Sequence, residues 1–535
     1  DGTTTSDVTF SGIIGGSNNI DTMTVSANAV ARLNANATFD GAYTNTGATY
    51  VGAGSTLSAL SLTDTGSYVL KVVDANGTLA TGDFGHLTDS GGGVATLTAS
   101  NVSINVTGDI GTANDILLLT NINLGAATLA DNSYQCTFTV KNDGNDTDVD
   151  VTKRTIASIV SSNPSTGNVG TVLDSLSSST DTEVALLIDN IAAASSEEAI
   201  ADLVESVSAN VDGGAVAGAT TVASQTAGIT NTQLAALRDG KESQTGMFAG
   251  NVTNGLRAWG QVFGSTGDQD QRDGVAGYEV DTYGLAVGLD TQSLAEDWIW
   301  GLAFAYADTD VDSKGVNNTE TEIDSYQVTL YGNYDWDDRT YISGQLGYVW
   351  SDNDQTRHDV AGVGSGITAQ GDYDSDTVIA RLEAGRKYMA GSNTVLTPKI
   401  LMNYQHFDAD NYTETGAGGL NLTTDSEELN LFEIGVGIDA SWDYQQADGS
   451  YLQPSLHAGV RHDLIGDEYE ATSTFAAGGA SFNTKGFDPA QTTFNAGAGV
   501  TYYSTTNWDL SAAYDFEYKS DYDAHSGTLR AAYKF

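Results

Sequence analysis

The chain is poor in several residue types that many folds and binding functions require. Its 535 residues contain one cysteine, Cys136, so no internal disulfide can form. We interpret Cys136, in the strand-like stretch YQCTFTV, as a small core residue. Basic residues number 21 against 70 acidic ones. The formal net charge of −49 argues against nucleic acid or anionic lipid as a binding partner.

Proline and long apolar runs are also scarce. The chain has 4 prolines beside 61 glycines, and no apolar run reaches the roughly 18 residues of a membrane-spanning helix. A membrane protein is still possible, because a barrel strand needs only about ten residues, of which alternate ones are polar. The first residue is Asp1 rather than methionine, and we expect a mature chain whose signal peptide was removed.

What the sequence does contain is alternation with period two. From Trp508 to Tyr518, apolar and aromatic residues occupy every second position and mostly polar residues lie between them. This pattern is typical of a strand with one wet face. About twelve such strands are predicted. They begin near Gly255, Val280, Asp297, Ile323, Asp338, Ser375, Thr394, Leu429, Ser450, Thr492, Asn507 and His525.

The connections between these strands distinguish a membrane barrel from a soluble sandwich, which would also alternate. Short connections (294–296, 335–338, 390–393, 445–449 and 505–506) alternate with long polar ones (266–279, 308–322, 351–374, 408–428 and 463–491). Outer-membrane barrels separate extracellular loops from periplasmic turns in this way. Aromatic girdles at the two interfaces are expected from Trp298, Trp300, Trp336, Trp350, Trp442 and Trp508.

The first 155 residues show shorter alternating runs, such as YVLKVV and VSINV, separated by small polar turns. Such strands favour a parallel β-helix in which each rung buries Val, Ile and Leu against the next. A β-sandwich is the alternative. The end of this part is more specific, because the strand DILLLTNIN at 115–123 precedes a hairpin-like segment.

Helical spacing replaces the alternation after about Lys153. Apolar residues at Val184, Leu187, Ile188 and Ile191 share one helix face. Ser195 or Ser196 is the expected N-cap of the next helix, with Glu197 and Glu198 in its first turn. The Gly/Ala stretch 213–218 is expected to loosen the chain. A further helix is predicted to begin at Thr230 and to end at Gly240.

Three stretches together resemble the classical monomeric autotransporters, the type V secretion family. They are AWGQVFGSTGDQDQRDGVAGYEVDTYGLAVGLDT at 258–291, the ILLLT strand, and the closing AAYDFEYKSDYDAHSGTLRAAYKF. The resemblance implies an all-β chain with a β-helical passenger at 1–155, a helical linker at 156–254 and a twelve-stranded outer-membrane barrel at 255–535. It also implies a helix through the pore, drawn from between Thr230 and Asn254, and a passenger on the surface of a bacterial cell.

The same resemblance implies partners. These are outer-membrane lipid and the cell's barrel-assembly machinery, whose recognition signal matches the terminal strand with Phe535. We expect a non-enzymatic surface protein that acts in adhesion, self-association of passengers or as a surface coat. The alternatives are an outer-membrane pore or transport protein, and a passenger that carries an unrecognised hydrolase.

Inward-facing charges are expected on the barrel strands, where they would hydrate the lumen and contact the pore helix. These candidate luminal residues are Arg381, Lys399, Glu433, Asp439, Asp515, Glu517, Arg530 and Lys534. Asn251 and Asn254 are candidate cleavage positions, because some relatives cut their passenger by asparagine cyclisation inside the pore. The paired-asparagine motif of those relatives is missing here.

Two further motifs, an acidic hairpin and the string DSGG, have both a structural and a functional interpretation. Oxygen ligands for calcium cluster at Asp143, Asn145, Asp146, Asp148 and Asp150, but the glycine and distal glutamate of an EF-hand loop are missing. A solvated acidic hairpin is therefore our default, and no other cofactor is predicted. The string DSGG at 89–92 lies near His86. We interpret it as a polar turn, because a catalytic triad needs its histidine on a distinct element.

Overall fold

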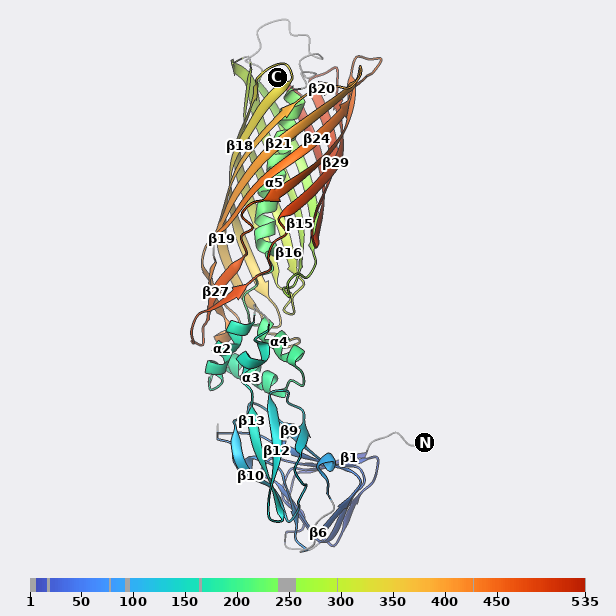
Figure 1. Cartoon of the computed structure of the whole chain (residues 1–535), viewed down its shortest axis with the longest axis vertical. Coiled ribbons are helices and arrows are strands. Elements are labelled where there is room, and N and C mark those ends of the chain that lie inside the picture. The colour runs from blue at the N-terminus through green and yellow to red at the C-terminus, as the bar shows by residue number, and fades with distance from the viewer. Residues whose placement is uncertain are drawn as a thin grey trace. The chain divides into compact units, whose positions relative to one another are not determined.

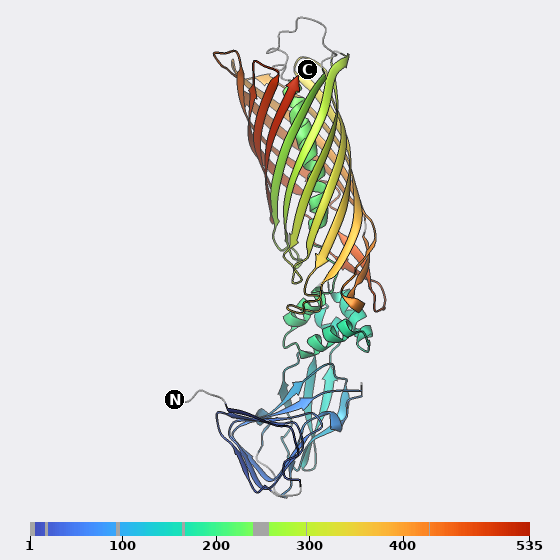
Figure 2. The same ribbon diagram turned by 180° about the vertical axis from the view of Figure 1, so that it is seen from behind.

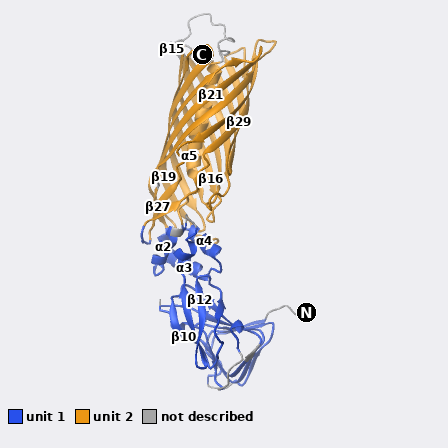
Figure 3. Ribbon diagram, viewed as in Figure 1, with its two compact units in different colours: residues 1–207, 418–420, 477–480 blue, residues 208–417, 421–476, 481–535 orange. Residues whose placement is uncertain are grey.

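The structure is a computed structural model that describes residues 6–16, 20–76, 78–91, 97–162, 166–238, 256–295, 297–426 and 428–534. The chain divides into two compact units, coloured separately in Figure 3. The first contains Asp1–Val207 with Gly418–Leu420 and Ala477–Ala480, and the second contains the remaining residues. Among the helices that the structure describes, none combines the length and apolarity needed to cross a membrane.

The N-terminal part of the first unit is a parallel β-helix, as predicted. One parallel stack has the order β1-β3-β5-β7-β9-β11 and the other has the order β2-β4-β6-β8-β10. The strands are β1 (Ser6–Phe10), β2 (Met23–Val25), β3 (Ala29–Leu33), β4 (Ala37–Asn45), β5 (Ala48–Val51), β6 (Thr56–Asp64), β7 (Ser67–Val72), β8 (His86–Asp89), β9 (Val102–Val106), β10 (Ala113–Thr120) and β11 (Thr128–Asp131). Inward residues of successive rungs stack into one apolar core, so the alternative of a β-sandwich is wrong.

A hairpin caps this stack. Strands β12 (Cys136–Asp143) and β13 (Asp146–Lys153) pair with each other, and they also pair antiparallel with β11 and β10. The turn between them places Gly144 at φ 65°, a conformation that glycine adopts without strain. Cys136 is buried in the core, as expected. The ILLLT strand is β10, and the predicted hairpin after it is confirmed.

Four short helices complete the first unit: α1 (Ile156–Val160), α2 (Gly167–Leu176), α3 (Thr182–Ala193) and α4 (Glu197–Glu205). The predicted apolar face of α3 is buried. The hydroxyl of Ser196 accepts a hydrogen bond from the Ala199 N–H, so Ser196 rather than Ser195 is the N-cap of α4. Glu197 and Glu198 occupy its first turn, as predicted.

The second unit is a closed antiparallel barrel. Among the described residues, its twelve long strands are β14 (Leu256–Gln269), β15 (Tyr278–Ala295), β16 (Trp298–Ser313), β17 (Glu320–Asp335), β18 (Thr340–Arg357), β19 (Ala369–Arg386), β21 (Thr394–Ala409), β24 (Leu429–Trp442), β26 (Tyr451–Asp463), β29 (Thr492–Tyr503), β30 (Trp508–Lys519) and β31 (Tyr522–Lys534). Pairing of β14 with β31 closes the ring. Closure leaves no unpaired strand edge.

The apolar face of each strand points outward. On β16 exposed and buried residues alternate from Trp298 to Ser313, and Leu302 is 56% exposed while Ala303 is 2% exposed. Trp298 and Trp300 stack with their ring centroids 5.2 Å apart on this outer face. The predicted split between an apolar outer face and a polar inner face is confirmed.

Several strands are longer than predicted. The expected loop 308–322 is mostly strand, because β16 runs to Ser313 and β17 begins at Glu320. Its acidic residues were taken for loop, but they continue the outward positions of the strands. One row of directly opposed carboxylates crosses five strands: Asp281, Asp310, Glu322, Asp354 and Asp372. The connection between β30 and β31 is also short, at 520–521, so long and short connections do not alternate strictly.

A long helix, α5 (Gly214–Arg238), lies inside the barrel. Figure 1 and the reverse view in Figure 2 both show it within the ring of strands. Two predictions are corrected here. The stretch 213–218 does not loosen the chain but begins this helix, and Thr230 is in the helix interior rather than at its cap. The pore helix therefore starts 16 residues before the expected Thr230, and residues 239–254 lie outside the described part.

The longest connections fold into a small sheet of their own, which we call the loop sheet. It consists of β22 (Tyr412–Thr413), β23 (Leu422–Ser426), β27 (Glu470–Phe475) and β28 (Phe482–Lys485) in antiparallel order. Figure 1 shows β27 at the end of the barrel opposite the mark for the C-terminus. We call this the long-loop end. Two short strands, β20 (Tyr388–Met389) and β25 (Tyr444–Gln445), lie in turns at the other end.

Candidate functional site

The barrel lumen is filled along α5 by small and apolar contacts. Val222, Ile229 and Leu234 of the helix pack with Trp259 and Tyr331 of the barrel wall, which are both almost fully buried. Glycine is required where the helix approaches the wall most closely. A Cβ on Gly214 would lie 2.5 Å from Val311 Cγ1, and a Cβ on Gly218 would lie 2.8 Å from Ile323 Cδ1. The Gly/Ala composition of the helix thus fits the width of the lumen.

Polar side chains fix the register of α5. The Gln233 amide donates to Asp290 Oδ2 over 2.8 Å, and the Asn231 amide donates to Glu383 Oε2 over 3.0 Å. At the last turn, Lys387 Nζ donates to the Arg238 carbonyl over 2.8 Å, which satisfies a free helix carbonyl. The helix is therefore held at defined positions rather than loosely enclosed.

Asp290 is the centre of one luminal network. It is 1% exposed, and its carboxylate is 3.1 Å from Arg257 Nε. The Tyr331 hydroxyl donates to the same carboxylate over 3.3 Å, and Trp259 Nε1 donates to the Tyr331 oxygen over 2.8 Å. Asp290 was not among the predicted luminal residues, although alternation from the outward Leu289 would have placed it inside.

Glu383 is the centre of a second network and was also missed. The Tyr341 hydroxyl donates to Glu383 Oε1 over 2.9 Å. Two predicted luminal cations surround this carboxylate, Arg381 and Lys399, each 3.8 Å away. Lys399 lies closer to the predicted Asp439, at 2.9 Å. The structure thus brings two predicted cations to one carboxylate that was not predicted, and Lys399 connects it to the predicted Asp439.

Arg461, which the sequence analysis did not single out, joins two predicted carboxylates. Its Nη2 donates to Glu517 Oε2 over 2.7 Å, and its Nε lies 3.2 Å from Glu433 Oε1. Glu433 also accepts a hydrogen bond from the Asn403 amide over 2.9 Å. Glu517 lies 3.6 Å from Lys519 as well. This cluster balances charge at the lumen wall.

The remaining predicted luminal residues are placed differently. Asp515 pairs with His457, whose Nε2 lies 2.8 Å from its Oδ1. Arg530 is buried and donates from Nε to the Ser511 hydroxyl over 3.2 Å. It does not pair with the acidic residues beside which it was expected. The side chain of Lys534 lies outside the described part, as do Asn251, Asn254 and Phe535.

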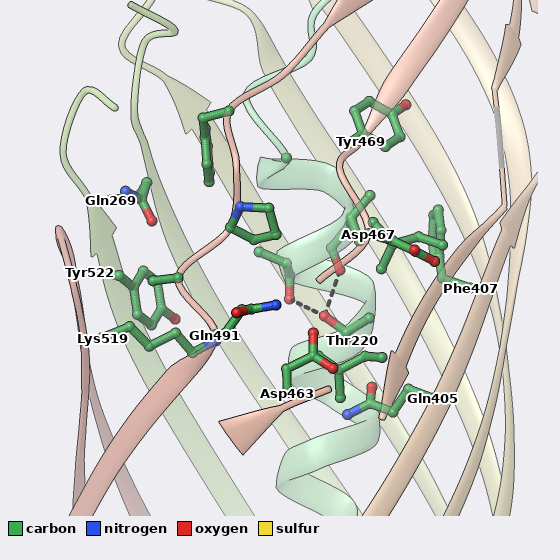
Figure 4. Close-up of a pocket in the computed structure, with 18 of the residues that line it drawn as sticks. Thr220, Gln269, Gln405, Phe407, Asp463, Asp467, Tyr469, Gln491, Lys519 and Tyr522 are labelled. Carbon is green, nitrogen blue, oxygen red and sulfur yellow. Dashed lines mark hydrogen bonds between the residues drawn. The ribbon is translucent and has the colours of Figure 1, made fainter. Parts of the chain in front are cut away.

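A cavity of about 160 Å³ remains beside the first turns of α5 (Figure 4). Val216, Ala217 and Thr220 of the helix line one side of it. The Thr220 hydroxyl is turned back onto its own helix, where it donates to the Val216 carbonyl over 2.7 Å. The opposite side carries aromatic and acidic residues, among them Phe407, Tyr469, Asp463 and Asp467. Packing of α5 thus leaves a gap at this position.

Two of the carboxylates considered for calcium accept hydrogen bonds within the β-helix. Asp146 Oδ1 accepts a hydrogen bond from the Asn121 N–H over 2.7 Å, and Asp150 Oδ1 accepts one from the Asp115 N–H over 3.0 Å. The second bond lowers the pKa of Asp150, whereas partial burial and the nearby Asp143 raise the pKa of Asp148. No group of three or more metal-binding side chains occurs in the described ranges. Asp146 and Asp150 thus act as acceptors for backbone N–H groups of the β-helix.

The DSGG string forms a local turn in the described residues. Asp89 Oδ1 accepts a hydrogen bond from the Gly91 N–H over 2.9 Å. The ring nitrogens of His86 face backbone oxygens, with Nε2 2.6 Å from the Thr81 carbonyl and Nδ1 3.3 Å from the Leu118 carbonyl. His86 is therefore directed to the backbone rather than to Ser90, which fits the interpretation as a polar turn.

Comparisons with known proteins agree with this geometry. Residues 258–515 match the family described as autotransporter beta-domain. The chain is 26% identical over 346 residues to outer membrane protein B of Rickettsia prowazekii (strain Madrid E), a match that covers 60% of this chain and 21% of that protein. It is 24% identical over 279 residues to an extracellular serine protease of Serratia marcescens, covering 52% of this chain and 26% of that protein. The chain thus matches about a fifth to a quarter of the length of these relatives.

One of the solved structures that the chain matches is the translocator domain of the autotransporter NalP from Neisseria meningitidis. The TM-score is 0.45 at 20% sequence identity, and the similarity covers 60% of this chain and 99% of that one. The family match begins on β14 and ends on β30, so it covers most of the closed barrel. Residues 258–515 therefore form an autotransporter β-domain, an outer-membrane barrel.

Proposed function

We propose that the barrel, residues 255–535, exports and anchors a passenger that comprises residues 1–155, with residues 156–254 as the linker. The passenger remains attached and is displayed on the cell surface in a non-enzymatic role, as an adhesin, a self-associating module or a coat. One observation supports this most: α5 is docked in the lumen by side-chain contacts from Gly214 to Arg238. A segment that is held in this way would tether whatever precedes it.

Two observations support the non-enzymatic role: the surroundings of His86 and the names of similar proteins. Within the described residues of the β-helix, His86 faces backbone carbonyls, and we found no triad geometry around it. The Rickettsia relative is named as an outer membrane protein, whereas the Serratia relative is named as a protease. A hydrolase passenger is therefore the alternative.

Two partners follow from this proposal. The cell's barrel-assembly machinery would insert the barrel into outer-membrane lipid. A second copy of the passenger would be the partner in self-association, with the polar outward rows of the β-helix as the contact surface.

Protease shaving of intact cells tests the display of the passenger. We expect loss of residues before about 155 and retention of a heat-modifiable fragment from about 255 to 535, both identified by mass spectrometry. A soluble periplasmic protein that stays intact serves as the control for cell integrity. If the N-terminal part is digested only after the outer membrane is permeabilised, the passenger is periplasmic and the proposal fails.

Conductance separates an anchor from a transport pore. Purified full-length protein in planar bilayers should conduct weakly, because α5 occupies the lumen. Deletion of residues 214–238 should raise the conductance strongly. Equal high conductance of both proteins would favour the pore alternative.

A further inference from the structure

A fully buried ion pair joins two segments at the long-loop end of the barrel. Arg357 is the last residue of β18, and Glu414 lies in the connection between β21 and β24, directly after β22. Their side chains are 0% and 2% exposed. The contact is bidentate, with Arg357 Nε donating to Glu414 Oε1 over 2.7 Å and Nη2 donating to Oε2 over 2.6 Å. This is the geometry in which arginine binds carboxylate most strongly.

The pair is completed by backbone groups from two further segments. Arg357 Nη1 donates to the Ser208 carbonyl over 3.2 Å. Ser208 belongs to residues 208–213, which precede α5 and which we call the neck segment. The Leu422 N–H of β23 donates to Glu414 Oε2 over 2.8 Å. The ion pair thus connects the barrel wall, the loop sheet and the neck segment.

A second contact between the loop sheet and the neck segment lies nearby. Gly486, which directly follows β28, donates from its N–H to the Tyr469 carbonyl over 2.9 Å. A Cβ added to Gly486 would lie 2.5 Å from the Val211 carbonyl oxygen of the neck segment. The backbones therefore meet at a distance that only glycine permits. Most of the neck segment is buried, including Val211 at 5% exposure.

We propose that the Arg357–Glu414 pair is a latch that holds the loop sheet closed over the barrel only when the neck segment is seated. Burial of two charges is costly, and the cost is offset only when both find full sets of partners. Arg357 takes one of its acceptors from the neck segment itself. Without that segment, Arg357 in the closed state would lack the Ser208 carbonyl as an acceptor. An open loop sheet, in which water solvates Arg357 and Glu414, would then be favoured. The inference is independent of what the passenger binds.

The latch is tested by amide hydrogen exchange in purified full-length protein, read by mass spectrometry in peptides that contain β23 and β27, because α5 fills the lumen whether the loop sheet is open or closed. E414Q preserves shape but removes the counter-charge, and R357M removes the cation. Because breaking a buried pair is strongly unfavourable, each single variant should raise the exchange rate of these amides roughly 100-fold or more. The double variant R357M/E414L replaces both charges by apolar side chains and should stay closed like the wild type. E470Q, at the more exposed Lys485–Glu470 pair of the same sheet, is the matched control and should change little.

G486A tests the role of the neck segment with both charges intact, since its methyl group would push against the Val211 carbonyl. It should raise the exchange rate of the loop-sheet amides as E414Q does. The latch is overturned if the loop-sheet amides of E414Q exchange like those of the wild type, if R357M/E414L exchanges as fast as the single variants, or if G486A exchanges like the wild type. It is also overturned if E414Q gives no heat-modifiable barrel, because the pair would then serve assembly and not closure.

Discussion

Removal of the Arg461 guanidinium should destabilise the barrel, because this cation lies between two luminal carboxylates. In R461M, Glu433 and Glu517 lose the contacts of 3.2 and 2.7 Å that neutralise them. Glu433 is 7% exposed at its side chain, so water replaces the lost partner only poorly. Loss of one partner of a buried pair costs about 3–5 kcal/mol.

The lower end of this range applies here. Glu433 keeps the Asn403 amide as a donor, and Glu517 keeps Lys519 at 3.6 Å. We therefore expect a loss of about 3 kcal/mol. For a barrel of about 280 residues, whose entropy of unfolding is roughly 2.1 cal/mol/K per residue, such a loss lowers the unfolding midpoint by roughly 5 °C. A second substitution, E433Q, removes one of the two carboxylate charges and should recover part of the loss.

The assay is heat modifiability on a gel after a fixed heating time, which gives an apparent midpoint even when unfolding is irreversible. K314M is the matched control, because the Lys314–Asp268 pair is largely exposed and should contribute less than about 1 kcal/mol. The reasoning is refuted if R461M melts with the wild type. It is equally refuted if R461M/E433Q melts below R461M.

Three further predictions concern both units. F138A removes a ring that is 0% exposed in the β-helix and should lower its stability by about 3–5 kcal/mol in chemical denaturation, and an unchanged midpoint would contradict the assigned core. Burial raises the pKa of the Cys136 thiol from 9.0 to about 11. The thiol should therefore resist labelling at pH 8 until the chain unfolds, and rapid labelling of native protein would contradict its burial. Because the folded state favours the neutral thiol, the thiol contributes about 2–3 kcal/mol to the free energy of unfolding below pH 9. This contribution is lost as the pH rises to about 11. Chemical denaturation of the wild type and of C136A at both pH values measures the loss. Finally, Asp310 stands directly opposite Asp281 and Glu322, so a rise from about 0.01 to about 0.15 M salt should raise the midpoint of the barrel by screening. D310N should show a smaller rise, and an equal rise would assign the salt effect elsewhere.

Strand positions could be predicted from sequence because each barrel strand meets lipid on one face and the lumen on the other. Two chemically different surroundings impose period two, and the predicted starts lie within a few residues of the observed ones. The largest difference occurs at β19, expected near Ser375 and beginning at Ala369. Acidic residues at outward positions beyond the apolar band were taken for loop there, as they were in β16.

The pore helix was misplaced for the opposite reason. Strands surround α5, so buried residues occur on all its sides and no apolar stripe marks it. Its glycines suggested a loose segment because their fit to Val311 and Ile323 is visible only in the folded barrel. Partners in the luminal networks are also distant in sequence, as Gln233 and Asp290 are. Alternation can place Asp290 inside, but only the barrel register determines what it meets.

The closed ring has a topological consequence for α5. Strands β14 and β31 join along thirteen paired positions, so the finished barrel has no lateral gap through which a helix could enter. The neck segment lies at one end of the helix, and Arg238 lies at the other. The chain is therefore threaded through a loop formed by its own later residues. Such a thread must either be in place before the β14–β31 seam closes or be drawn in lengthwise. Unthreading the chain would then require all residues before Gly214 to pass back through the ring.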